Sequence, residues 1–350
     1  MYDEVSLMMP KVSYIVAVYN VADYIEQCAR SLFEQTLEDI EIIFVNDASS
    51  DGCGEIIRRT LEEYPHRKGQ VKILTHEKNK GIVETRKDGL SAACGEYINF
   101  IDGDDYVEPR MAELMYGKAV EKDADIVVCD IFWYERNSMR VVSLAPNGII
   151  GNGENVRDDT INRKVMPNIW CRLIRRTLFE ENHIVWPVAA QIEDMVLSVQ
   201  AVYYAKRIAH VPVPLYCYRL NPHSISCVNT LENSEKKLHM FVQNNKVIFD
   251  FLKRNGVAEK YSQGILINKM GAKNHIIHYT SQRKYLKLWL NTYPELNKLL
   301  VFGDKNHKST YREKIWFFIV CLGLYPKLEH QLKSRRFKPD ALWLRGTYNR

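Results

Sequence analysis

Five short apolar runs stand out in the first 130 residues of the chain. They contain mostly β-branched and aromatic residues, with few polar interruptions. A continuous run of this kind is typical of a strand that is buried on both faces, as in a parallel sheet. The pattern predicts strands at residues 12–18, 41–45, 71–74, 97–101 and 126–129.

Apolar residues recur at helical spacing between these runs. Ile25, Cys28 and Leu32 share one face of a predicted helix, and two more helices are expected at residues 52–61 and 82–94. Asp51 is expected to cap the first of these two. Alternation of strand and helix predicts an α/β domain built from right-handed βαβ units.

The later part of the chain has a different pattern. A strongly apolar helix is expected at residues 192–205 and a short strand at residues 216–219. Beyond residue 231 nearly all of the sequence is typical of helix. We therefore predict two parts, a catalytic α/β domain at residues 1–230 and a mainly helical region at residues 231–350.

Charge follows the same division. Residues 231–350 hold 23 Lys and Arg against 9 Asp and Glu, whereas residues 1–230 hold 25 against 34. An acidic body with a basic C-terminal region suggests that the two parts have different partners. The basic region is expected to be either a solvated helical domain or a contact to a membrane surface or an acceptor.

The eight cysteines are scattered, and no C-x-x-C pair occurs. This spacing argues against a zinc ribbon and against a disulfide framework. Residues 1–10 lack the apolar core of a signal peptide, and no run reaches the ~18 apolar residues that span a bilayer. We expect a cytoplasmic protein.

Three carboxylates follow the fourth predicted strand in the order Asp102, Gly103, Asp104, Asp105. Ligands of α/β sheets collect at the carboxyl ends of strands, and neighbouring carboxylates repel one another unless a cation neutralises them. Hard ions such as Mg²⁺ or Mn²⁺ favour these oxygens and also bind substrate phosphates. The alternative is an acidic turn in which Asp105 caps the next segment.

Two further loops carry polar residues that suit a nucleotide. Asp47 follows the second strand and can accept the imide N–H of uracil, although the loop also has the composition of a simple βα turn. Asn79 and Gly81 lead into the helix that bears Arg86. Helix N-terminal amides and a guanidinium suit a diphosphate, and an exposed basic helix face is the alternative.

Taken together, four motifs resemble family 2 glycosyltransferases with the GT-A fold, over residues 11–225. The motifs are V-A-V-Y-N at residues 16–20, N-D-A-S-S-D at 46–51, N-K-G-x-x-x-x-R at 79–86 and D-G-D-D at 102–105. The resemblance implies a mixed, centrally parallel sheet flanked by helices. It further implies that the nucleotide is held by Val18, Tyr19, Asn20, Asp47, Asn79, Gly81, Arg86 and Asp102.

The same resemblance assigns chemistry to other positions. Asp104 is the expected metal ligand, with Asp102 close to the ribose, the metal or the sugar. Asp194 is the expected general base and Glu193 an acceptor-side neighbour, whereas two acids that merely complement a helix dipole are the alternative.

Trp170 and Arg172 match a segment that lies near the acceptor in relatives, where the Trp170 ring can pack against a sugar. Many relatives also carry a histidine metal ligand where this chain has Asn221. His223, two residues later, is a candidate to replace that ligand, although a solvent-exposed loop histidine is the alternative.

Residues 315–325 form an almost unbroken apolar segment with basic residues on both sides. A buried helix is one interpretation. The other is a helix that lies in the plane of an anionic membrane, with a basic rim that contacts the lipid headgroups.

We therefore predict a metal-dependent, inverting hexosyltransferase of the family 2 type. It would move a sugar from a nucleotide diphosphate donor, expected to be UDP-linked, to a saccharide or lipid-linked acceptor in surface polysaccharide synthesis, with Mn²⁺ or Mg²⁺ as cofactor. A location at the inner face of the membrane follows from this acceptor, and no nucleic acid partner is expected.

Two alternatives remain open at this point. One is a nucleotidyltransferase that makes sugar nucleotides, which would normally carry a glycine-rich basic loop after the first strand. The other is a non-catalytic nucleotide-sugar or membrane-binding module of the same fold. A dinucleotide-binding dehydrogenase is disfavoured because no G-x-G-x-x-G follows the first strand.

Overall fold

The computed structural model describes residues 9–135, 138–221, 224, 230–303 and 311–328. In this part of the chain nine strands form one sheet in the order β3-β2-β1-β4-β8-β6-β9-β5, and β7 pairs with β6 beside this path. Internal contacts divide the chain into two compact units. The first unit contains residues 1–160 and 165–222, and the second contains residues 161–164 and 223–350.

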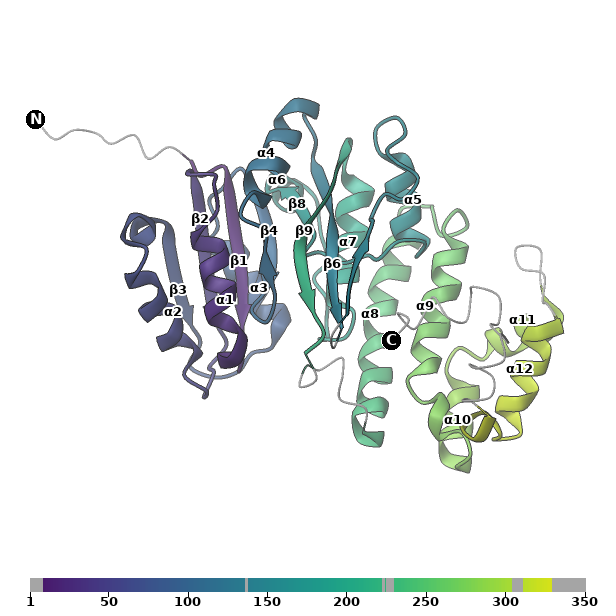
Figure 1. The fold of residues 1–350 in the computed structure, drawn as a ribbon. Helices are drawn as coiled ribbons and strands as arrows, with labels where there is room; N and C mark the ends of the chain where they lie inside the picture. The colour runs from purple at the N-terminus through teal and green to yellow at the C-terminus, as the bar shows by residue number, and fades with distance from the viewer. Residues whose placement is uncertain (1–8, 136–137, 222–223, 225–229, 304–310, 329–350) are drawn as a thin grey trace, which may run out of the picture. The chain divides into compact units, whose positions relative to one another are not determined.

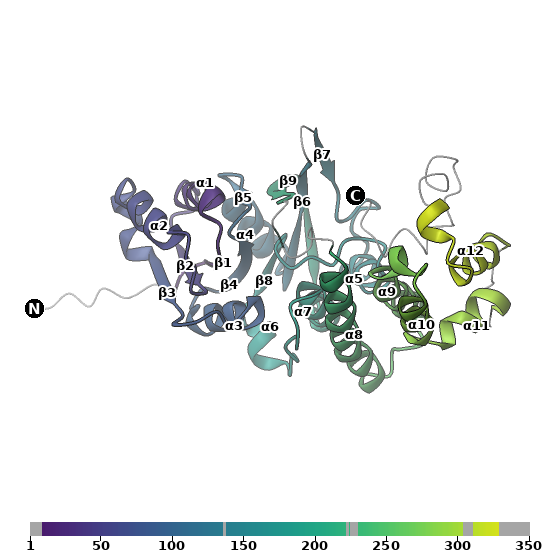
Figure 2. The same cartoon turned by 90° about the horizontal axis from the view of Figure 1, so that it is seen from below.

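Half of the sheet is parallel, as the apolar runs predict. Its strands are β3 (Val71–Thr75), β2 (Ile40–Asn46), β1 (Val12–Val18) and β4 (Tyr97–Asp102). Every residue of β1 and β2 is buried. Helices α1 (Ala22–Phe33) and α2 (Cys53–Glu62) cover one face, and α3 (Ile82–Ala92) covers the other (Figures 1 and 2). A 3₁₀ turn, Pro65–Gln70, leads into β3.

The other half of the sheet is mixed. Its strands are β8 (Arg172–Arg175), β6 (Ile126–Glu135), β9 (Ile208–Arg219), β5 (Tyr106–Val107) and β7 (Ser138–Val142). Strand β8 runs antiparallel to both β4 and β6, whereas β9 runs parallel to β6. The direction of the sheet therefore changes between β4 and β8. The strand expected at residues 216–219 is the end of the longer β9.

Four helices accompany this half: α4 (Met111–Lys122), α5 (Glu154–Ile161), α6 (Thr177–Glu181) and α7 (Glu193–Tyr204). Helix α7 is the predicted apolar helix, and its residues from Met195 to Val202 are buried. The first unit is thus a mixed α/β sheet between helices. The predicted fold class is confirmed, including the helical C-terminal region.

One glycine sets how closely α3 packs on the sheet. A Cβ atom at Gly89 would lie 2.3 Å from Cγ2 of Ile15 and 3.2 Å from Cγ2 of Val45. Real Cβ contacts do not come this close, so a larger residue would push α3 away from β1 and β2. The position of Arg86, one turn earlier on α3, depends on this contact.

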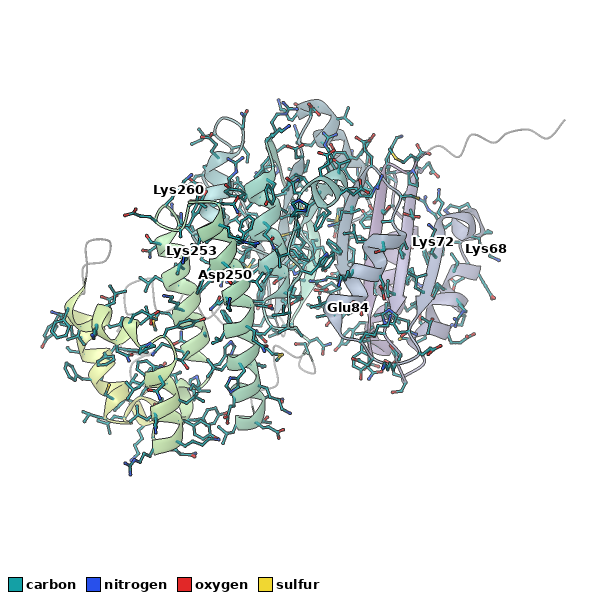
Figure 3. The ribbon with its side chains drawn as sticks, turned by 180° about the vertical axis from the view of Figure 1, so that it is seen from behind. Lys68, Lys72, Glu84, Asp250, Lys253 and Lys260 are labelled. Carbon is teal, nitrogen blue, oxygen red and sulfur yellow. The ribbon has the colours of Figure 1, made fainter. Side chains whose placement is uncertain are left out.

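The second unit is helical. Its elements are α8 (Leu231–Arg254), α9 (Ser262–Asn274), a 3₁₀ turn (Ile277–Tyr279), α10 (Arg283–Asn291), α11 (Glu295–Phe302) and α12 (Tyr311–Cys321). Thr230 caps α8, since its Oγ1 accepts a hydrogen bond from the Asn233 backbone N–H at 3.3 Å. Charged side chains such as Asp250, Lys253 and Lys260 are exposed on this unit (Figure 3).

Helix α12 contains most of the apolar segment near the C-terminus, and the side chains of this segment differ in burial. Trp316 and Val320 are buried, with the Trp316 ring 5.8 Å from the ring of Trp289. Phe318 and Leu322 are 54% and 70% exposed. One face of the helix is therefore core of the second unit. Among the described residues no helix is long and apolar enough to cross a bilayer.

Candidate active site

The loops after β1 and β2 meet at the carboxyl edge of the parallel half-sheet, because parallel strands end on the same side. They are joined by hydrogen bonds. The Asn20 backbone N–H donates to Ser49 Oγ at 3.2 Å, and the Ser50 N–H donates to Asn20 Oδ1 at 3.0 Å. Asp51 accepts from the N–H groups of Cys53 and Ala22 at 3.2 and 2.7 Å. This carboxylate therefore stabilises the starts of both α2 and α1.

The predicted nucleoside residues of the first loop differ in exposure. Val18 is buried, whereas the Tyr19 ring is 49% exposed. Asn20 and Ala48, in the second loop, have φ angles of 50° and 57°. Non-glycine residues rarely adopt this left-handed conformation, and such strain is typical of ligand-binding loops. A contact of these residues with a nucleoside stays a prediction.

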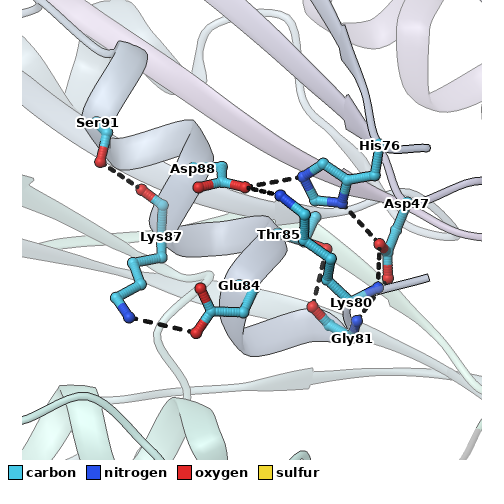
Figure 4. Close-up of polar contacts among 9 residues, drawn as sticks. All are labelled: Asp47, His76, Lys80, Gly81, Glu84, Thr85, Lys87, Asp88 and Ser91. Carbon is cyan, nitrogen blue, oxygen red and sulfur yellow. Dashed lines mark hydrogen bonds and ion pairs between the residues drawn. The ribbon is translucent and has the colours of Figure 1, made fainter. Parts of the chain in front are cut away.

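Asp47 is buried, and both of its oxygens already accept hydrogen bonds (Figure 4). Oδ1 accepts from the Lys80 backbone N–H at 2.7 Å, and Oδ2 accepts from the Gly81 N–H at 2.8 Å. A nitrogen of the His76 ring lies 2.7 Å from Oδ1. The carboxylate thus holds the loop before α3, which is a role that the sequence did not predict. Asn79 is exposed on this loop.

Within the acidic cluster, Asp105 joins the turn after β4 to strand β9. It is buried, and it accepts hydrogen bonds from the Tyr216 hydroxyl and from the Arg219 backbone N–H, both at 2.7 Å. Burial and the two neighbouring aspartates raise the pKa of Asp105 well above its usual range. Gly103 lets this turn pass β1, because a Cβ there would lie 2.8 Å from the carbonyl oxygen of Ala17.

Asp104 is the carboxylate of the cluster that best suits a divalent cation. Burial raises its pKa, and the charge of Asp102 raises it further. A cation would offset this repulsion, so the donor set fits the expected ion. The Asn221 amide donates to Asp104 Oδ2 at 3.0 Å, from the position at which the sequence resemblance led us to expect a histidine ligand.

His223 lies outside the described residues. Among the residues that the structure describes, no group of three or more His, Cys, Asp or Glu side chains could hold a metal ion. Asp104 and Asp102 therefore remain predicted ligands, which would share the ion with diphosphate oxygens and water.

Arg86 is placed differently from the sequence interpretation. Its side chain is only 2% exposed, and its guanidinium bridges two carboxylates. Nη2 donates to Asp102 Oδ1 at 2.8 Å, and Nη1 donates to Glu193 Oε1 at 2.9 Å. A guanidinium paired in this way links the end of strand β4 to the start of helix α7. Its contact with a diphosphate stays a prediction.

The start of α7 brings the predicted base to the same place. Ile192, directly before the helix, has a φ of 60°, an uncommon conformation for a β-branched residue and one that marks a constrained turn. Burial raises the pKa of Glu193 to about 8, although the Arg86 charge opposes the rise. Asp194 is half-buried, and its Oδ1 accepts a hydrogen bond from the Met195 N–H at 2.7 Å.

The predicted acceptor residues lie in the interior of the first unit. Trp170 is 3% exposed, and its ring stacks on Tyr216 and Tyr218 with centroids 4.3 and 5.4 Å apart. Arg172 is fully buried, and its Nη2 donates to the carbonyl oxygen of Met166 at 3.2 Å. Both side chains support the mixed half-sheet here, and acceptor contact by either one stays a prediction.

Two residues of this site were missed from the sequence. Tyr216 lies in a predicted strand, but nothing marked its hydroxyl as a partner of Asp105. His76 follows β3, at the same edge of the sheet as the other candidate loops. That placement was a usable signal, because a histidine at the carboxyl end of a parallel strand lies near any ligand at this edge.

Comparison with known proteins decides the family. The description "Glycosyl transferase family 2" fits residues 13–197, more than half of the chain. The chain belongs to glycosyltransferase family 2. This glycosyltransferase is 35% identical to EpsJ, an uncharacterised glycosyltransferase of Bacillus subtilis, over 63% of its own length and 64% of that relative. It is 32% identical to EpsH, a putative glycosyltransferase of the same organism, over 72% of each chain.

Two solved structures resemble the glycosyltransferase in fold. Residues 1–349 of Staphylococcus aureus TarS in complex with UDP-GlcNAc have a TM-score of 0.65 and 17% identity, and the match covers 93% of this chain and 92% of that TarS chain. A mannosyltransferase of Pyrobaculum calidifontis in complex with GDP-Man and Mn²⁺ has a TM-score of 0.51 and 15% identity, covering 94% and 89%. The likeness to TarS bears out the GT-A type of fold.

Proposed function

We propose that this glycosyltransferase moves a sugar from a UDP-sugar to a saccharide or lipid-linked acceptor, with inversion at the anomeric carbon. One observation carries the proposal. The buried Arg86 guanidinium bridges Asp102, at the end of the donor-side strand, and Glu193, next to the candidate base Asp194. Carboxylates from two segments that are far apart in the sequence are thereby held around one guanidinium. A single displacement requires groups of the donor side and of the acceptor side to lie close together in this way.

In the proposed reaction Asp194 takes the proton of the acceptor hydroxyl. The hydroxyl oxygen forms a bond to the anomeric carbon while the bond from that carbon to the diphosphate oxygen breaks. The bonding electron pair leaves with the diphosphate. Glu193, held by Arg86, keeps the start of α7 and hence Asp194 in place.

A divalent cation, Mn²⁺ or Mg²⁺, fits the donor side of this proposal. Asp104, with Asp102 beside it, would hold the ion, which would neutralise charge on the departing diphosphate. The chemistry of the cluster supports this, since its carboxylates repel one another. The Mn²⁺ in the mannosyltransferase of similar fold is consistent with it.

A uridine nucleotide is the donor that we favour, on the resemblance of the first two loops and on the UDP-GlcNAc bound by TarS. The test is nucleotide release from a panel of UDP-, GDP- and dTDP-sugars, each with Mn²⁺ and with Mn²⁺ removed by chelation. We expect release from UDP-sugars that depends on the metal. Release from GDP-sugars alone would overturn the choice of base, and release without metal would overturn the role of the cation.

We also propose that the second unit contacts an anionic membrane surface that carries a lipid-linked acceptor. Exposed apolar side chains gather in its last two helices and after them: Phe302, Phe318, Leu322 and Leu324. The sequence surplus of basic residues beyond residue 231 has the complementary charge. An apolar face with basic flanks is typical of interfacial helices.

A further inference from the structure

The clearest unassigned feature of the first unit is the ring of His76, which lies between two carboxylates (Figure 4). Its Nδ1 is 2.7 Å from Oδ1 of Asp47, and its Nε2 is 2.9 Å from Oδ2 of Asp88. The side chain is only 6% exposed. Asp47 follows β2, whereas Asp88 lies on α3, so the ring joins two elements across the end of β3.

Both ring nitrogens of His76 face carboxylate oxygens. An ionised carboxylate only accepts hydrogen bonds, so each ring nitrogen that faces one must carry a hydrogen. Burial tends to raise the pKa of Asp47, but the hydrogen bonds from His76 and from two backbone amides hold it below its usual range. Lys80 and then His76 lower the pKa of Asp88. With both partners ionised, each of the two contacts requires a hydrogen on the ring nitrogen that makes it.

Charged groups surround the ring. Asp47 after β2 and Asp88 on α3 contact it directly, and the Lys80 ammonium lies 3.0 Å from Asp88 Oδ2. The two carboxylates therefore alternate with the imidazole ring and the ammonium group across the cluster. The nearby Lys87–Glu84 pair, at 3.2 Å on the outer surface of α3, makes no contact with the ring in the structure.

Through Asp47, the His76 ring is connected to the start of the helix that carries Arg86. Asp47 accepts the N–H groups of Lys80 and Gly81, and Gly81 has a φ of 86°, which is available to glycine. Helix α3 begins at the next residue. Removing the ring would take away one of the three hydrogen bonds to Asp47 and so weaken its hold on the loop before α3, which is a predicted nucleotide contact.

We propose that His76 is a positioning residue for the donor: its ring links Asp47 to Asp88 and so orders the loop at residues 77–81 that receives the nucleotide. The inference rests on the proposed function, because it assigns this loop to the donor. It adds a residue that contacts no substrate itself and acts through Asp47.

The test measures UDP affinity by calorimetry on the full-length chain with Mn²⁺. We expect His76→Gln to weaken UDP binding roughly 10-fold, the effect of one displaced hydrogen bond between charged groups. Asp88→Asn should weaken it less, and adding Asp88→Asn to His76→Gln should change nothing more. Lys87→Gln is the matched control on the same helix and should bind UDP as the wild type does.

A spectroscopic measurement separates positioning from a purely structural role. In a long-range ¹H–¹⁵N spectrum of the histidine rings, both nitrogens of His76 should carry hydrogens and should shift when UDP binds. Wild-type affinity in both His76→Gln and Asp88→Asn, or a singly protonated ring, would overturn the inference alone. If the wild type binds no UDP, the proposed donor fails and the inference fails with it. Should His76→Gln not fold, Asp88→Asn and the spectrum still decide.

Discussion

Replacing Glu193 by glutamine tests whether burial or the Arg86 ion pair dominates at the start of α7. The side chain is 14% exposed, and burial raises its pKa to about 8 despite Oε1 lying 2.9 Å from the guanidinium. Glutamine has the shape of the protonated acid and can still accept a hydrogen bond from Arg86. The substitution therefore removes only the ionisation.

The expected effect depends on pH in a defined direction. An unfolded glutamate has a pKa of about 4.3, so the folded value is the higher one. Stability that comes from protonated Glu193 is therefore fully present below about pH 4 and is lost as the pH rises through about 8. Since one pKa unit corresponds to about 1.4 kcal/mol and the two pKa values differ by roughly 3.7, Glu193→Gln should gain on the order of 4–5 kcal/mol at pH 8 but only about 1 kcal/mol at pH 5.

Urea unfolding of the full-length chain, followed by tryptophan fluorescence at about pH 5 and pH 8, measures this difference. Glu113→Gln is a suitable control, because Arg110 holds the pKa of the exposed Glu113 down at about 2. That variant should gain nothing at pH 8. An equal gain for Glu193→Gln at both pH values, or a loss at pH 8, would show that Glu193 is ionised in the folded protein.

Three other substitutions test the remaining roles. Asp104→Ala should abolish metal-dependent UDP binding in calorimetry while keeping or raising the melting temperature, because repulsion from Asp102 is relieved; unchanged metal-dependent affinity would remove Asp104 from the site. Asp194→Asn should lower kcat roughly 10²–10⁴-fold with UDP affinity kept, and turnover within a few-fold of wild type would leave it as a helix-capping acid. Phe318→Ser with Leu322→Ser should reduce flotation with phosphatidylglycerol vesicles at high salt, where the charge attraction is screened; undiminished flotation would place the contact elsewhere.

The positions of the strands in the parallel half of the fold were predictable from the hydrophobic pattern of the sequence. Buried parallel strands need apolar side chains on both faces, so their positions show as continuous runs. The ends of such strands must meet at one edge, which is why loops as far apart as Asn20, Asp47 and Asp102 could be assigned to one site. Strand β9 was cut short in the prediction, because Pro212 and Pro214 interrupt it beside a bulge opposite Asp130.

The contacts between distant segments were not predictable. Arg86 and Glu193 are 107 residues apart, and nothing in either local pattern shows that they pair. Trp170 and Arg172 have side chains of the kind that often recognise ligands at a protein surface, yet both are buried. Burial of such residues depends on which aromatic and carbonyl groups of other strands surround them. A single sequence does not contain that information in its periodicity.

The junction between β4 and β8 has a consequence for how such an enzyme can diverge. Among the residues that the structure describes, two backbone pairs join strands β4 and β8: Tyr97 with Arg175 and Ile98 with Ile174. Beyond them the Asn99 side chain substitutes for a strand partner, donating to the carbonyl oxygens of Trp170 and Arg172, each at 2.9 Å. So narrow a seam should let the segment after residue 110 change in sequence while the backbone hydrogen bonds among β1, β2, β3 and β4 stay as they are.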